Sequence, residues 1–264
     1  MMPCRIPAGL AAFVVVLSSC GKREVPIVEV KGECGDLFKA QVCTWARTQG
    51  TALVEVGATV PIASIENAPA AGGPMSWPPA TDANLKLPES VLPQSGLTNL
   101  TVYWEATGHP PGAYLTPHFD FHFYTVPTAD RMAIDCKDLV KPSALPAGYG
   151  LPDVPLPPDM AKMLGVDTLV GLCVPQMGMH SAPAAELAST GVFRGTMVVG
   201  YYHGKPIFVE PMLSRAMLME KKSFDLPIAP IPGMTGAYPR TFHADYDAQQ
   251  QQYRFVFSGF AATN

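Results

Sequence analysis

The chain has 264 residues, a formal net charge of −4, and hydrophobic and charged fractions of 48% and 15%. This length and composition allow one large globular domain or two small ones. Binding to nucleic acid needs clustered positive charge, so no nucleic-acid partner is expected. The 28 prolines and 23 glycines favour a turn-rich, strand-dominated chain. We therefore expect a mainly β fold, a sandwich or a barrel, with a few short α-helices.

Residues 1–19 resemble a bacterial lipoprotein signal peptide. Arg5 precedes an apolar run, residues 6–17, that is too short to span a bilayer. Residues 17–21, Leu-Ser-Ser-Cys-Gly, resemble the recognition site of signal peptidase II. The resemblance implies cleavage before Cys20 and lipid attached to its sulfur, which makes the membrane a partner through that anchor. An ordinary secretory signal in which Cys20 has no role is the alternative.

Lipidation predicts a location in the cell envelope, facing the periplasm. Because Gly21 is not aspartate, the sorting rule of Gram-negative bacteria points to the outer membrane. Residues 20–33 are predicted to be a tether that lifts the protein off the membrane. Residues 34–264 are predicted to form a single β-rich domain.

The cysteines support an oxidising compartment. Cys4 would leave with the signal peptide and Cys20 would carry lipid. The four cysteines left are Cys34, Cys43, Cys136 and Cys173. Their even number predicts two disulfides, and of the three possible pairings we prefer Cys34–Cys43 with Cys136–Cys173, which closes the shortest loop first. A zinc ion held by the four thiolates is the rival, but the chain has no Cys-x-x-Cys pair.

The strands of the first half are short. Alternation of apolar and polar residues predicts strands at residues 52–56 and 99–105. Residues 68–92, rich in proline, glycine and alanine, are predicted to be a long surface loop.

Residues 118–124, His-Phe-Asp-Phe-His-Phe-Tyr, carry the strongest pattern in the chain. Successive side chains of a strand point to opposite faces, so the three phenylalanines would form one aromatic stripe. The opposite face would then carry His118, Asp120, His122 and Tyr124. The sequence thus predicts a strand with one apolar face and one face rich in metal-ligand and acid–base groups.

The second half of the chain mixes helices and strands. Helices are predicted at residues 128–134, with Thr128 as N-cap, at residues 159–164, and from Pro211 to residue 221. The predicted strands are residues 168–174, 196–202, 206–210, 241–246 and 253–260. The turn between the second and third of these is residues 203–205, and the last two form a closing hairpin.

Three segments in fixed order resemble a known family. They are GHPPGAYLTPHFDFHFYTVPTADRMAI at 108–134, PQMGMH at 175–180 and GKPIFVEPM at 204–212. Together they resemble a bacterial extracytoplasmic domain of unknown function, family fifty-six-zero-two, over about residues 97–264. The resemblance implies the domain but no activity. In that family a tryptophan and an aspartate follow the histidine that matches His180; here Ser181, Ala182 and Pro183 follow, so a role needing that pair is not expected.

The histidines and carboxylates of these segments suggest a divalent transition-metal site. Its candidate ligands are His118, Asp120, His122, His180 and Glu210. Three imidazoles with carboxylates suit zinc, iron, copper or manganese, and Asp120 could bind the ion or orient an imidazole. Residues four apart on a flat strand are separated by about 13 Å, so one ion would be held by His118 or by His122 rather than by both unless the strand bends.

Two other interpretations stay open at this stage, a buried polar network and a ligand-binding or catalytic pocket without metal. The polar strand face could be a buried hydrogen-bonded network that fixes the sheet register. In that case Glu210 would cap a helix or pair with Arg215, and His203 and His243 would face solvent.

As to function, we expect a binding or envelope-associated protein with a candidate metal site, or else a metal-dependent enzyme of unassigned reaction using the same face. Motifs of hydrolases and nucleotide-binding proteins are not present in the sequence.

Overall fold

The computed structural model describes residues 25–71, 77–189, 191–234 and 237–262. The predicted signal peptide and Cys20 lie outside these ranges. Within them, no helix has both the length and the apolar character needed to cross a membrane.

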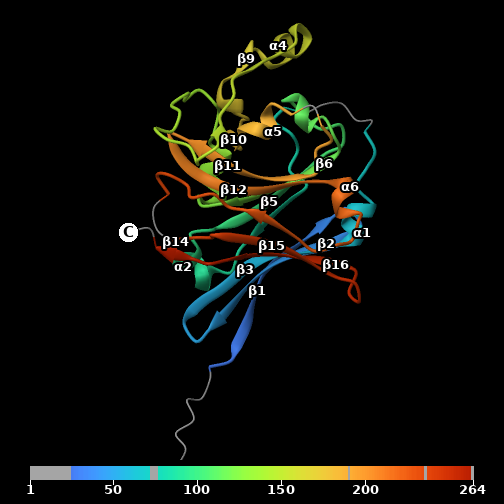
Figure 1. Ribbon diagram of the computed structural model, residues 1–264, viewed down its shortest axis with the longest axis vertical. Coiled ribbons are helices and arrows are strands. Elements are labelled where there is room, and N and C mark those ends of the chain that lie inside the picture. The colour runs from blue at the N-terminus through green and yellow to red at the C-terminus, as the bar shows by residue number, and fades with distance from the viewer. Residues whose placement is uncertain (1–24, 72–76, 190, 235–236, 263–264) are drawn as a thin grey trace, which may run out of the picture.

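Two antiparallel sheets face each other and form a sandwich, which confirms one of the two expected β architectures (Figure 1). The first sheet has the order β1 (Ile27–Leu37), β2 (Ala40–Gln49), β3 (Ala52–Pro61), β16 (Gln252–Ser258), β15 (Thr241–Asp247) and β13 (Phe224–Pro227). The second has the order β4 (Ala83–Lys86), β5 (Asn99–Glu105), β6 (His118–Tyr124), β12 (Lys205–Ser214), β11 (Gly195–Tyr202), β10 (Met179–Pro183) and β7 (Tyr149–Gly150). Each sheet, over the described residues, ends in two edge strands, so the sheets do not close into a barrel.

The remaining elements are short. Two small sheets pair β14 (Ala237–Tyr238) with β17 (Ala261–Ala262) and β8 (Val154–Pro155) with β9 (Thr168–Leu169). The α-helices are α1 (Ile62–Glu66), α2 (Leu92–Ser95), α3 (Thr128–Met132), α4 (Pro158–Leu164), α5 (Ala184–Leu187) and α6 (Arg215–Leu218). The 3₁₀ turns of the described residues are η1 (Glu89–Val91), η2 (Gly112–Tyr114) and η3 (Val170–Leu172).

Strand β6 lies between β5 and β12 in the second sheet, and every one of its residues is buried. Its phenylalanines point into the core between the sheets, where Phe121 packs against Phe255 and Phe123 against Phe257 of β16, with ring centroids 4.9 and 4.7 Å apart. Edge-to-face packing of this kind adds to the stabilisation from burial. The predicted aromatic stripe is confirmed.

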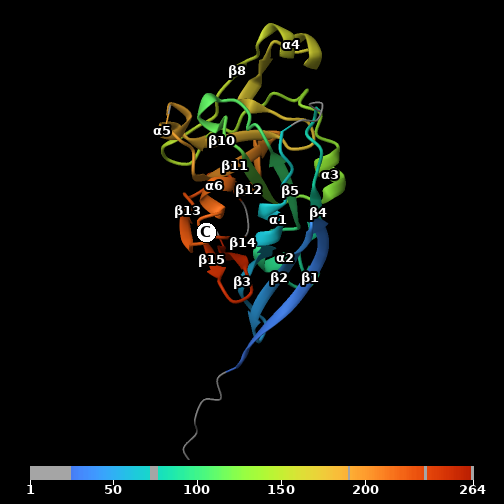
Figure 2. The ribbon, with the colours of Figure 1, turned by 90° about the vertical axis from the view of Figure 1, so that its right-hand side faces the viewer.

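A second layer covers the outer face of the second sheet. The chain between β6 and β11, with α3, α4 and α5, lies on this side (Figure 2). A second apolar cluster fills the space beneath it and includes Tyr114, Tyr124, Phe193, Phe208 and Met212. The polar face of β6 is therefore buried too, under loops rather than under a second sheet.

The first sheet extends further toward the N-terminus than predicted. Strand β1 begins at Ile27, inside the segment 20–33 expected to be a tether, so a tether can extend only to residue 26. Most residues of β1 are exposed, and an exposed edge strand lacks the alternation by which a strand is recognised. Likewise the predicted loop 68–92 contains β4, a strand of four residues with Ala83 and Leu85 buried and paired with β5.

Pro211 does not begin a helix. It stays in β12, paired with Met197 of β11, and α6 starts only at Arg215, with the Ser214 hydroxyl accepting a hydrogen bond from the Met217 amide. In the ladder between β12 and β6, Val209 and Met212 are paired with β6 but the two residues between them are not. The N–H that Pro211 lacks is therefore not needed for a hydrogen bond to β6.

Two smaller boundaries also differ. The predicted helix at 128–134 forms as α3, but Thr128 is its first residue and no side chain caps it. The predicted strand 168–174 ends after β9, because Gly171 adopts φ 60° and turns the chain into η3. The predicted hairpins around residues 203–204 and at the C-terminus are confirmed.

Both preferred disulfides are present. Cys34–Cys43 joins the paired strands β1 and β2, and Cys136–Cys173 links two segments 37 residues apart in the cover of the second sheet. All four cysteines are therefore used, which rules out the alternative of a four-thiolate zinc site. Cys173 of the second disulfide directly follows η3, whose Leu172 carbonyl lies 3.0 Å from His180 Nδ1.

Candidate metal centre

The five predicted ligands all lie on the covered face of the second sheet. His118, Asp120 and His122 point outward from β6, and Glu210 comes from the adjacent strand β12. His180 comes from β10, two strands further along, and reaches the site beside Phe208, whose ring is 4.6 Å from that of His122 and 5.2 Å from that of His180. Gly200 of β11 makes this possible, since an added Cβ there would lie 1.8 Å from the Phe208 ring.

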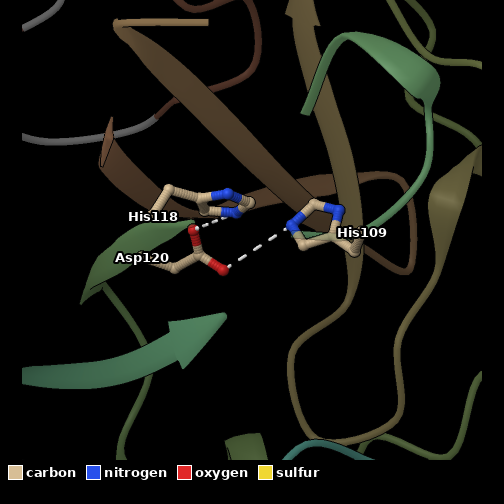
Figure 3. Close-up of side chains that lie close together, drawn as sticks. All are labelled: His109, His118 and Asp120. Atoms are coloured by element: carbon tan, nitrogen blue, oxygen red, sulfur yellow. Dashed lines mark ion pairs between the residues drawn. The ribbon is translucent and has the colours of Figure 1, made fainter. Parts of the chain in front are cut away.

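The first group of candidate ligands joins His118, Asp120 and a residue not predicted, His109 (Figure 3). The Asp120 Oδ1 atom lies 3.2 Å from His118 Nε2, and its Oδ2 atom lies 3.7 Å from His109 Nε2. His109 comes from the loop before β6, which folds back so that the His109 amide donates to the Tyr114 carbonyl. One carboxylate thus lies between two imidazoles.

The second group consists of His122, His180 and Glu210. The His122 Nε2 atom lies 3.3 Å from His180 Nε2 and 3.4 Å from Glu210 Oε2. His122 and Glu210 are fully buried, and His180 lies at the edge of a cleft. The strand residues His118 and His122 belong to different groups, as the spacing of residues on β6 predicts.

Backbone carbonyls fix the orientation of three of the four imidazoles. The Nδ1 atoms of His109, His118 and His180 lie 2.8, 2.6 and 3.0 Å from the carbonyl oxygens of Pro110, Thr116 and Leu172. A carbonyl oxygen only accepts, so each Nδ1 carries the hydrogen and Nε2 of the neutral ring keeps a lone pair. The Nε2 atoms of His109 and His118 face Asp120, and that of His180 faces His122. Metal-binding histidines are oriented in this way in proteins.

Several buried polar atoms of the centre lack a hydrogen-bond partner among the described residues. They include His118 Nε2, His122 Nδ1, Asp120 Oδ1 and Glu210 Oε2. Buried polar atoms in folded proteins nearly always have a partner. Lone pairs of imidazole and carboxylate that face each other repel, and a cation between them would satisfy both. These residues therefore fit a metal ion.

Asp120 and His109 favour their charged forms. Burial by itself would raise the pKa of Asp120, but the charges of the neighbouring His118 and His109 hold it well below its usual value. Burial would lower the pKa of His109, but the hydrogen bond to Asp120 and the charges of Asp120 and Glu105 raise it to about 9. A proton on His109 is thus what a bound cation would replace.

The second group favours neutral forms. Burial, reinforced by the charges of Asp120 and Glu105, raises the pKa of Glu210 well above its usual value. Burial lowers the pKa of His180 to about 4. Burial and the charge of the neighbouring His180 lower the pKa of His122 well below its usual value. Both imidazoles of this group are therefore neutral at physiological pH, the state in which imidazole binds a metal.

A buried guanidinium lies behind the second group. Arg131 Nη1 donates to the Tyr103 hydroxyl and to the Gln176 carbonyl, both at 3.0 Å, and its guanidinium lies 5.5 Å from the centre of the Tyr124 ring. The Tyr103 ring in turn packs edge-on against His122. The positive charge of Arg131 contributes to the low pKa of His122.

A cleft of about 580 Å³ leads from the surface to the centre. His109, Asp120 and His180 line it, together with the carboxyl groups of Asp82 and Glu105 and mostly apolar side chains. Its lining, within the described part of the chain, contains neither lysine nor arginine. The volume is typical of small-molecule sites, and the charge favours entry of a cation.

The structure thus brings all five predicted ligands together but divides them between two groups. His109 was missed as a ligand, although it begins the same motif, because sequence spacing does not reveal that the loop folds back. Gly108 permits that fold with φ 69°. The expected Glu210–Arg215 pair is wrong, since Arg215 donates to the carbonyls of Ile65 and Glu66.

The two remaining histidines are as expected. His203 and His243 are largely exposed and pair with Asp138 and Asp225 on the surface.

Comparison with known proteins finds no matching family model, no matching curated protein and no matching solved structure. The resemblance to family fifty-six-zero-two therefore stays a prediction.

Proposed function

We propose that this protein binds a divalent transition metal in the centre formed by β6, β10, β12 and the loop before β6. The observation that carries the proposal is that backbone carbonyls accept the Nδ1 hydrogens of three imidazoles and so orient their Nε2 atoms. Those of His109 and His118 face the Asp120 carboxylate, and that of His180 faces His122, which lies beside Glu210. The spacing supports it too. Ligands about 2.1 Å from a tetrahedral ion are about 3.4 Å apart, and the separations here are 3.2–3.7 Å.

The mixed donor set fits zinc, iron, copper or manganese. An ion bound there would act as a Lewis acid and lower the pKa of a coordinated water. The residues of this chain would hold it, exclude bulk water beneath the covering loops, and keep each imidazole in the correct tautomer.

Elemental analysis of protein purified without an affinity tag tests the proposal. We expect at least one equivalent of a transition metal per chain after dialysis against Zn²⁺ and removal of loosely bound ions. His118→Ala and His180→Ala should each lower the bound amount, whereas His243→Ala, which alters an exposed histidine, should not. Wild-type protein that is folded and holds no stoichiometric ion under these conditions would contradict the proposal.

A second candidate is a metal-dependent enzyme, favoured by the cleft that reaches His109, Asp120 and His180. Open access for a small molecule is what a catalytic metal needs and a structural one does not. Turnover of chromogenic carboxylic or phosphoric esters that requires the ion and disappears in Asp120→Asn would favour the enzyme. Metal binding without turnover on any substrate of the panel would favour the binding protein.

We also propose that the protein is anchored by lipid on Cys20 in the cell envelope, facing the periplasm. The lipobox-like residues 17–21 and the two disulfides support this. The start of β1 lies at the opposite end of the long axis from α4 and the covering loops, so an anchor there would direct the cleft away from the membrane (Figures 1 and 2).

Cys20→Ser is expected to move the protein from the membrane fraction to the soluble periplasmic fraction. Without the thiol no diacylglyceryl group can attach, and each buried methylene contributes roughly 0.8 kcal/mol of membrane affinity. Fractionation followed by immunoblotting measures the change, with Cys4→Ser as the matched control. Retention of Cys20→Ser in the membrane fraction would contradict lipid anchoring.

A further inference from the structure

We infer that the centre holds two metal ions, one in the group His109, His118 and Asp120 and the other in the group His122, His180 and Glu210. This inference rests on the proposed function and specifies the number of ions and the ligands of each.

One ion cannot use all six residues. His118 and His122 are four residues apart on β6, a separation of about 13 Å along a strand. Each belongs to a separate set of three donors whose ligand atoms lie within 4.8 Å of one another. Two ligands of one ion at about 2.1 Å can be at most about 4.2 Å apart. The strand therefore presents its two imidazoles to two positions.

Each group is sufficient for an ion by itself. Each supplies two imidazole nitrogens and one carboxylate oxygen, a ligand set of the kind found in catalytic metal sites that keep one position for water. In the first group both imidazoles are oriented by backbone carbonyls, and in the second His180 is. Both groups contain a buried polar atom without a hydrogen-bond partner among the described residues, His118 Nε2 in the first and Glu210 Oε2 in the second.

The two groups meet at their carboxylates. Asp120 directs one oxygen to His118 and the other to His109, and it is near enough to Glu210 that its charge helps to raise the pKa of the Glu210 carboxyl group. Glu105, opposite His118 in the β5–β6 ladder, adds a third carboxyl group beside the first position. Carboxylates shared between neighbouring positions are what two cations at short range require, and water entering by the cleft can complete the coordination of each ion.

The test is the stoichiometry of Zn²⁺ measured by elemental analysis and by calorimetric titration of metal-free, full-length mature protein. Wild type and the surface control His243→Ala should bind two ions per chain. His109→Ala, in the first group, and His180→Ala, in the second, should each bind one, and the double variant none. Far-ultraviolet circular dichroism of each metal-free variant, with His109→Gln and His180→Gln as milder replacements, separates ligand loss from unfolding.

The outcomes separate the two ideas. One ion per wild-type chain would overturn the two-ion inference and leave the proposed metal binding intact. Two ions that are both retained in His109→Gln and His180→Gln would overturn the assignment of ligands. No bound ion in folded wild type would overturn both. With Mn²⁺ in place of Zn²⁺, spin coupling between the two ions should appear in the electron paramagnetic resonance spectrum of wild type and be lost in either single variant.

Discussion

Asp120→Asn is expected to weaken metal binding by more than about 100-fold. Removing a residue that merely orients a ligand costs 10–100-fold, and Asp120 directs its own oxygens at both His109 and His118. The amide keeps the shape of the side chain but loses its charge and one of its acceptor oxygens. Competition with a chromophoric chelator at constant pH and salt measures the change in affinity.

The matched control is Asp225→Asn. Asp225 also pairs with a histidine, since its Oδ1 lies 2.8 Å from His243 Nδ1, but this pair lies on the surface. We expect the control to keep wild-type affinity. An Asp120→Asn affinity within about threefold of wild type would show that Asp120 is not a ligand.

Phe121→Ala is expected to lower the free energy of unfolding by about 3–5 kcal/mol. The side chain is fully buried between Phe119 and Phe255, with ring centroids 5.8 and 4.9 Å away. Its removal loses buried apolar area and two aromatic contacts and leaves a cavity in the middle of the sandwich. Urea unfolding of the metal-free protein, monitored by circular dichroism, measures the loss.

Phe224→Ala provides the comparison. Phe224 is half-buried on the edge strand β13 and packs on Tyr253 with centroids 6.1 Å apart. We expect it to cost about 1 kcal/mol, because a partly exposed side chain buries less area. Equal losses for the two variants would mean that the aromatic stripe of β6 does not form the centre of the core.

The sequence predicts the two faces of β6 well, because the period-2 pattern of residues 118–124 is a local property of a strand. It also predicts that His118 and His122 do not both bind one ion, since that follows from the rise per residue alone. The disulfide pairing follows from a simple preference for the short loop. These predictions need no knowledge of which strands are neighbours.

What the sequence could not predict depends on contacts between distant segments. His109 joins the centre only because its loop folds back over β6, and His180 only because Gly200 leaves room for Phe208. The start of β1 and the continuation of β12 through Pro211 depend on neighbouring strands rather than on local pattern. Local propensity is overridden at each of these positions by the sheet.

The most direct test of the account is an anomalous-difference map from crystals of tag-free protein grown with Zn²⁺, with data collected on both sides of the zinc absorption edge. We predict two peaks, one about 2.0–2.2 Å from His118 Nε2 and an Asp120 oxygen, the other at that distance from His180 Nε2 and a Glu210 oxygen. A well-ordered centre with no anomalous peak within bonding distance of any of these atoms would contradict the account.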